Sequence, residues 1–209
     1  MSIANKLVTI AENEQKVYEA GKQAEYDRFW DIYQENGNKK SWEFAFAGGG
    51  WDDAVYNPKY PINVTGSASN MFSNSYRLIS TKVPIILSGK NTPNVFTWSS
   101  ALKTIPSIKV TDTVIYNSWF TNCIVLEEIN FTEDSVIGNS INLSPCTKLT
   151  LGSLKSIISA LKDFSGTNKE FTCTLTLSGE SQAILNADGA TAPNGLTWLE
   201  YAYSKCWNC

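Results

Sequence analysis

The amino-acid sequence predicts an α+β solenoid, in which short segments of chain stack on one another between a long N-terminal helix and an α/β C-terminal cap. Two observations predict the stack. Residues 62–152 repeat one apolar pattern four times, with a repeat length of about 23–24 positions, and a unit of this length cannot bury its apolar face without neighbours. A third observation, the different periodicity of residues 1–36 and 153–209, sets the helix and the cap apart.

Composition and charge bound the class of protein. The chain has 209 residues, of which 43% are hydrophobic and 18% charged, so it can fold around a sizeable core. Its net charge of -3 offers no basic surface, so we expect neither a nucleic-acid nor a membrane partner. It begins without the pattern of a signal peptide and has no apolar run near the roughly 20 residues of a membrane span, so we expect neither feature.

Histidine is absent from the sequence. This removes the usual general base of hydrolytic triads and the commonest metal ligand, so we expect a protein that is not an enzyme and needs no metal or cofactor. Paired carboxylates remain at Asp52–Asp53 and at Glu133–Asp134, which keeps a carboxylate-dependent glycan hydrolase as an alternative. Adjacent acids in a polar stretch are more often solvated turn residues.

Residues 1–36 are rich in Ala, Glu, Lys and Gln and contain no proline, which predicts a long helix. Apolar residues recur on one side of it at Ile3, Leu7, Ile10, Val17 and Ala24. The heptad pattern is weak, because charged residues or glycine occupy the later positions of the seam that begins at Leu7. The helix either lies on the rest of the fold or forms an oligomerising stem, for which a homotrimer is one possibility.

Residues 37–61 are predicted to cap the start of the stack. Trp42, Phe44 and Phe46 alternate with smaller residues, which predicts a strand, and Gly48 to Gly50 end it in a turn. The glycines do not form a phosphate-binding loop, because Trp51 follows them where that motif needs Lys and Ser or Thr.

The repeat is defined by a small residue that recurs in one frame, at Ser75, Ser99, Cys123 and Cys146. Three positions before it stands a large apolar residue, three after it a leucine, and six after it, in the middle copies, an isoleucine. These ladder residues are Phe72, Phe96, Phe120, Leu143, Leu78, Leu102, Leu126, Leu149, Ile105 and Ile129. We expect them to form a continuous core, in which cysteine acts as a small hydrophobe and serine finds a backbone partner.

The pattern Phe-x-x-Cys-x-x-Leu-x-x-Ile, as in Phe120 to Ile129, resembles the BspA-type leucine-rich repeat. An apolar pair precedes the small residue in three copies, at Met71–Phe72, Val95–Phe96 and Trp119–Phe120. The resemblance covers about Ile62 to Leu154, with Ser for Cys in two copies and Leu143 for Phe. It implies a leucine-rich repeat of about four coils, one short strand per coil, and a binding function without a reaction centre.

The order of helix, "FAGGGWDDAVYNPKY" and closing "LTWLEYAYSKCWNC" is also similar to leucine-rich-repeat proteins of bacteriophage tails and prophage regions of gut bacteria. This resemblance implies a virion component with a virion or extracellular location. Its helix would join other virion proteins or sister chains, and its repeats would bind a protein or carbohydrate ligand on a bacterial surface. A bacterial surface or secreted interaction protein with no virion role is the alternative.

The segment 153–209 is predicted to close the stack. Apolar spacing predicts a helix over 154–164, alternation predicts a strand over Phe171–Leu177, and two short helices are expected at 178–186 and 197–206. The closing "CWNC", Cys206 to Cys209, has redox-motif spacing without the usual structural context, which favours a plain tail.

Ligand binding is expected beside the ladder, where the repeats stop resembling one another. Tyr76, Trp98, Asn122 and Ile124 flank the small residue of three copies, and the pattern points them outward. Exposed aromatic side chains give large contact area at little entropic cost, so these four are the predicted ligand-binding residues. The alternative is that they only pack along the edge of the repeats.

Overall fold

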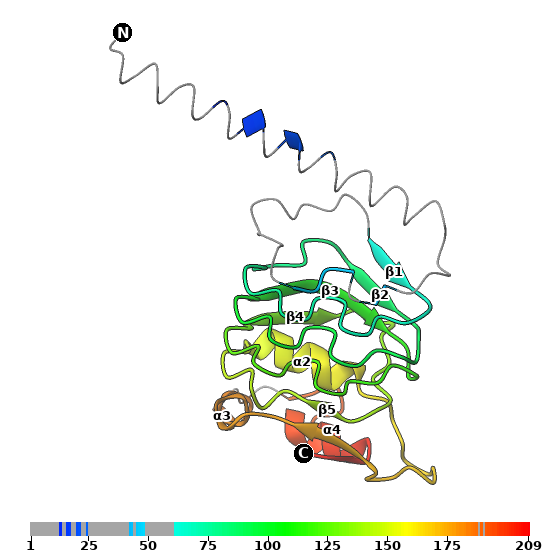
Figure 1. Ribbon diagram of the computed structural model, residues 1–209. Helices are drawn as coiled ribbons and strands as arrows, with labels where there is room; N and C mark the ends of the chain where they lie inside the picture. Colours follow the sequence, from blue (N-terminus) through cyan, green and yellow to red (C-terminus); the bar gives the residue numbers. More distant parts are fainter. Residues whose placement is uncertain are drawn as a thin grey trace.

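The computed structural model describes residues 13, 16–17, 20–21, 24, 42–43, 45–48, 61–187, 189 and 191–209. Two small parallel sheets and three helices make up the body of this described part. The first sheet has the order β1 (Ile62–Val64), β2 (Ile85–Leu87), β3 (Thr104–Val110) and β4 (Glu128–Phe131). The second has the order β5 (Ile141–Asn142), β6 (Cys173–Thr176) and β7 (Trp207–Asn208), with helices α2 (Leu151–Ala160), α3 (Gly179–Ala187) and α4 (Trp198–Ser204). Figure 1 shows β1 to β4 in succession, α2 next, and the second sheet's β5 with α3 and α4 at the far end.

The first sheet pairs residues that are one repeat apart. Ile62 pairs with Ile85, and Ile85 pairs with Ile108, so the same step along the chain separates both pairs. Ile105 pairs with Ile129, which is a slightly longer step, and a bulge within β3 absorbs the difference. The three paired residues of β1 and of β2 alternate between buried and half-buried, so one face of the sheet points into the core.

Opposite the sheet, turns of successive repeats stack on one another. The rings of Phe46, Phe72, Phe96 and Phe120 form a row with centroids 4.8, 5.6 and 5.9 Å apart and nearly parallel planes. Backbone hydrogen bonds run along the same direction, for example from the Phe72 amide to the carbonyl oxygen of residue 95 at 2.8 Å. All the ladder and small-residue positions of the repeat are buried.

The small residue of the repeat donates a hydrogen bond inside this core. Ser75 donates to the carbonyl oxygen of Phe46 at 2.8 Å, and Ser99 donates to that of Phe72 at 2.7 Å. The Cys123 thiol makes the equivalent contact with the Phe96 carbonyl at 3.1 Å. Each of these three donors therefore has an acceptor inside the core, the carbonyl oxygen of the phenylalanine in the preceding repeat or segment.

Helix α2 covers the outer edge of β4. Thr150 caps the helix by accepting a hydrogen bond from the Ser153 amide. The hydroxyl oxygens of Ser153 and Ser156 accept the amides of Ile129 and Phe131 at 2.9 and 2.7 Å. The two serine hydroxyl groups thus accept the hydrogen bonds that a fifth strand would accept from the outward-facing amides of β4.

The C-terminal cap contains the strand and helices that its sequence predicts, although α2 spans Leu151–Ala160 where the sequence predicted 154–164. The prediction of a plain tail at Cys206 to Cys209 is wrong, because these residues include strand β7, which pairs with β6, and the Trp207 ring is fully buried. The Lys205 ammonium is also buried and donates to three carbonyl oxygens at the end of α2, at 2.9 to 3.2 Å.

The strand predicted across Trp42 to Phe46 is wrong for the described residues there, which form turns and bends. The amides of Trp42, Phe46 and Gly48 donate to carbonyl oxygens within 67–73, so this segment joins the turn side of the stack and not the sheet. Alternation of aromatic residues suggested a strand. In the structure the Phe46 ring stacks on Phe72 and the Trp42 ring packs on Phe46, while Phe44 lies outside the described residues.

The predicted N-terminal helix lies mostly outside the described residues, including Ile3, Leu7 and Ile10. The described residues within it are helical, and Val17 and Ala24 are both exposed. None of the helices in the described part of the chain is long and apolar enough to cross a membrane.

Candidate functional site

Three of the predicted ligand-binding residues are exposed on the turn side of the stack. Tyr76, Trp98 and Ile124 come from three successive repeats and expose 51%, 48% and 49% of their surface. We call these three residues the turn-edge row. The fourth predicted residue, Asn122, is half-buried. Each of the three side chains is large and apolar, and such side chains can contribute to a binding surface when they lie together.

The turns that carry this row use left-handed backbone at fixed positions. Asn74, Trp98 and Asn122 have φ values of 57°, 62° and 61° and occupy the same place in three successive repeats. Asparagine tolerates this conformation, whereas a bulky aromatic residue is strained in it. Trp98 is therefore the exception among the three equivalent positions, since the preceding and following repeats carry asparagine there.

The left-handed conformation turns backbone amides along the stack. The Asn74 amide donates to the carbonyl oxygen of Thr97, and the Trp98 amide donates to that of Thr121, each at 2.8 Å. The Tyr76 hydroxyl donates to Asn74 Oδ1 at 2.9 Å, which fixes the position of its ring. The backbone under the row is thus held by neighbouring repeats, so Trp98 stays in its strained conformation.

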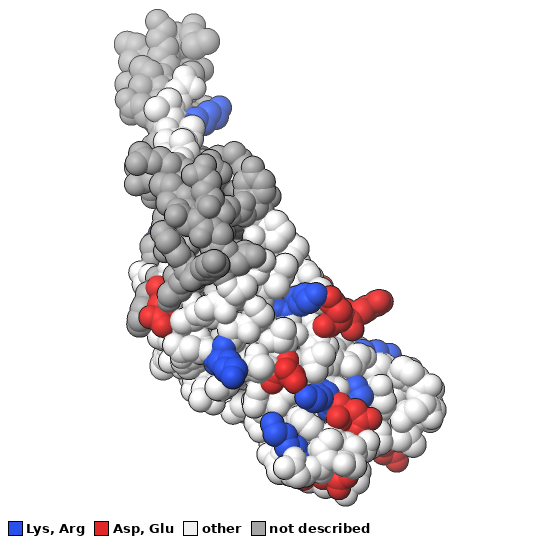
Figure 2. Space-filling view, turned by 90° about the vertical axis from the view of Figure 1, so that its right-hand side faces the viewer, with Lys and Arg blue, Asp and Glu red and all other residues white. Residues whose placement is uncertain are grey.

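Charges of both signs alternate on the surface of the stack. Figure 2 shows Lys and Arg side chains interspersed with Asp and Glu over the described part of one face. Lys162 forms an ion pair with Asp112 at 2.6 Å, and Lys109 forms another with Asp134. The Lys162 hydrogen bond lowers the pKa of the Asp112 carboxyl below its usual value.

The Glu133–Asp134 carboxylates lack the environment of an acid catalyst. Asp134 is hydrogen-bonded to Lys109 and to the Thr132 hydroxyl, and these contacts lower its pKa, whereas a general acid needs a raised one. Both residues are exposed. The other predicted pair, Asp52–Asp53, lies outside the described residues.

The cysteines are free thiols. Cys123, Cys146, Cys173 and Cys206 are buried and Cys209 is exposed. Burial raises the pKa of Cys123 to about 12 and that of Cys146 still further, so neither forms the reactive thiolate near neutral pH. Within the described ranges, no group of three or more His, Cys, Asp or Glu side chains could hold a metal ion.

The turn-edge row can bind but has no group poised for chemistry. It offers two aromatic rings and one aliphatic side chain on a backbone fixed by neighbouring repeats. The strain at Trp98 was missed by sequence reasoning, although asparagine at both equivalent positions is a signal that could have revealed it. Comparisons with known proteins found no family model, no curated protein and no solved structure that matches this chain.

Proposed function

We propose that this chain is a non-catalytic binding protein of a bacteriophage or prophage virion, a tail component that attaches to the host surface through the turn-edge row. Its residues 62–152 would form a leucine-rich-repeat solenoid that displays the row, and its N-terminal helix would join other virion proteins or sister chains. The supporting observation is the exposed Trp98 side chain on left-handed backbone.

Stability alone does not account for Trp98. A non-glycine residue in left-handed conformation costs about 1 to 2 kcal/mol, and an asparagine at this position would reduce that cost. Half of the indole surface is exposed, so burial does not compensate fully. A residue that is unfavourable for folding and exposed is the expected arrangement for a binding anchor, and tryptophan is enriched among such anchors.

The test uses Trp98→Asn in the full chain. We expect this variant to be more stable than the wild type by about 0.5 to 1 kcal/mol, because the strain is relieved. We also expect it to bind host bacterial cells about tenfold or more weakly, because the anchor is lost. Fluorescently labelled protein on a panel of gut bacteria measures binding, and thermal unfolding measures stability.

Ile115→Ala is the matched control, because Ile115 is also an exposed apolar residue, at 39%, but lies outside the turn-edge row. It should leave cell binding unchanged. Equal binding by Trp98→Asn and wild type would exclude the row as the attachment site. If the wild-type protein bound none of the cells tested, the attachment role would be excluded in favour of a purely structural role in the virion.

A further inference from the structure

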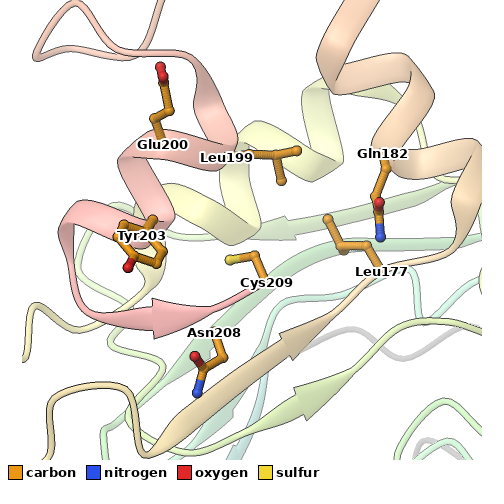
Figure 3. A pocket seen from close by; sticks show the side chains of 7 residues that line it. All are labelled: Leu177, Gln182, Leu199, Glu200, Tyr203, Asn208 and Cys209. Carbon is orange, nitrogen blue, oxygen red and sulfur yellow. The ribbon is translucent and has the colours of Figure 1, made fainter.

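The C-terminal cap contains a pocket of about 350 Å³ between helices α3 and α4 and the ends of β6 and β7. Figure 3 shows Leu177 and Leu199 beside it, with Tyr203 on one side and Gln182 on the other. This volume lies within the range of small-ligand sites, which are mostly apolar with a few placed polar groups. None of its lining residues belongs to the turn-edge row.

An aromatic surface forms one wall of the pocket. Tyr203 exposes 61% of its surface, the largest exposed fraction of any aromatic residue in the described part of the chain. Phe171, exposed by 38%, extends this wall, with its ring centroid 4.9 Å from that of Tyr203. Phe171 also has left-handed backbone, with a φ of 54°. Two exposed rings thus lie side by side, one of them on strained backbone.

The polar groups of the pocket are amides. Asn208 donates from Nδ2 to the Phe171 carbonyl oxygen at 2.6 Å, which leaves its Oδ1 as an acceptor. The Gln182 side chain makes no hydrogen bond within the described residues, so it keeps both donor and acceptor capacity. Both amides are exposed at the pocket and can exchange water for ligand hydroxyl groups.

Glu200 is the one charged side chain among the residues that line this pocket. The Glu200 carboxylate is used by the cap of α4, where it accepts hydrogen bonds from the Thr197 amide at 2.9 Å and hydroxyl at 2.8 Å. In Figure 3 its side chain points away from Cys209 and the other lining groups. Burial raises the pKa of the Cys209 thiol to about 11, so this group is neutral near pH 7.

We propose that this pocket binds one ring of a neutral saccharide. A sugar ring presents a C–H face, which packs on an aromatic wall, and hydroxyl groups, which pair with amides. The apolar surfaces of Leu177 and Leu199 complete the contact with the ring face. An anionic ligand finds no cation among the lining residues, and a cationic ligand finds only a carboxylate that is already hydrogen-bonded.

The proposal goes beyond attachment through the turn-edge row, and the two can fail independently. The experiment titrates the full chain with neutral trisaccharides of glucose, galactose and N-acetylglucosamine, with a sialylated trisaccharide as the charged probe. Binding is followed by NMR spectroscopy. We expect at least one neutral trisaccharide to bind saturably and to shift resonances of Tyr203 and Gln182.

Variants then locate the site. Tyr203→Ala should weaken binding about tenfold or more, because the ring wall is lost, whereas Tyr203→Phe should retain it. Gln182→Ala, which truncates an exposed side chain and leaves folding intact, should weaken binding by a smaller factor. Ile115→Ala, which lies outside both the pocket and the turn-edge row, should leave it unchanged.

Three results would overturn the assignment. One is the absence of saturable binding by any neutral trisaccharide, and another is equal binding by Tyr203→Ala and wild type. The third is preferential binding of a short apolar peptide at the Tyr203 site, because the pocket would then accept a protein side chain in place of a sugar ring.

Discussion

The Ser99 hydroxyl donates a 2.7 Å hydrogen bond to the carbonyl oxygen of Phe72, in the preceding repeat. The same bond recurs from Ser75 to Phe46 and, with a thiol donor, from Cys123 to Phe96. Serine and cysteine therefore share one position in the repeat because each is small and can donate. This relationship accounts for a sequence variation that otherwise looks like a lost cysteine motif.

Ser99→Cys should preserve stability to within about 1 kcal/mol, because the thiol is a small hydrophobe that can replace the hydroxyl donor. Ser99→Ala should cost about 1 to 3 kcal/mol, because the hydrogen bond from the buried hydroxyl to the Phe72 carbonyl oxygen is then lost. Urea unfolding of both variants measures the difference. Equal losses in the two would show that volume and not hydrogen bonding selects the residue.

Thiol chemistry should distinguish one cysteine from the other four. In the folded protein we expect a thiol-specific reagent to modify only Cys209, and all five cysteines to react in denaturant. Cys209 is exposed, but its thiol lines the cap pocket, where partial desolvation raises its pKa to about 11. Its reaction should therefore accelerate about tenfold for each pH unit between 7 and 10. Mass spectrometry of the labelled protein identifies the modified residue. Labelling of Cys206 at a similar rate would contradict the packing of β7.

Lys205→Met should destabilise the protein by about 2 to 4 kcal/mol, because three carbonyl oxygens at the end of α2 lose their buried donor. Burial also lowers the pKa of Lys205 below its usual 10.5, against the opposing charge of Asp163. Between the lowered value and 10.5 the unfolded chain binds more protons than the folded chain, so this lysine makes stability rise with pH in that window. The variant should lack this rise in chemical unfolding measured from pH 8 to 10.5.

Ser153→Ala and Ser156→Ala should each cost about 1 to 2 kcal/mol, because each removes the acceptor of a β4 amide. Ser159→Ala is the control, since its side chain is exposed on the same helix and makes no side-chain hydrogen bond in the described structure. Thermal unfolding compares the three variants. Equal behaviour of Ser159→Ala and Ser153→Ala would mean that α2 protects the edge by packing alone.

Solution mass tests the proposed stem. If the weak heptad joins sister chains, light scattering should give a trimer for the full chain and a monomer after deletion of residues 1–36. If the full chain remains monomeric at micromolar concentration, the helix does not join sister chains. It would then contact other proteins or the body of the fold.

Much of the described fold follows from the repeat interval in the sequence. The regular spacing of Ser75, Ser99 and Cys123 agrees to within one residue with the step between paired strand residues of the first sheet, because both are set by the length of one segment. Alternation at 171–177 identified β6, since its side chains alternate between core and solvent. In each case a regular period in the sequence corresponds to a regular period in space.

Other features have no periodic signal. Phe46 stands further from Phe72 than one repeat interval, so it escaped the pattern, although its ring continues the same row. The turn position of Asn94 and Ser118 becomes strand β5 in the next copy, because β6 is present there to pair with it. The cap pocket depends on Tyr203, Asn208 and Cys209, which come together only when the C-terminal residues form β7. The structure at these positions depends on contacts between distant parts of the chain, which a local sequence pattern does not reveal.

The near-constant register from β1 to β4 also means that the first sheet can grow or shrink only by whole segments. Inserting or deleting one whole segment, for example Phe72 to Val95, would move β1 relative to the second sheet by one strand spacing, about 4.8 Å. Both ends would keep their contacts, because each segment touches only its neighbours. An insertion of a single residue in a strand would instead reverse which side chains face the core. The distance between β1 and the second sheet is thus a property that evolution or design can set by the number of segments.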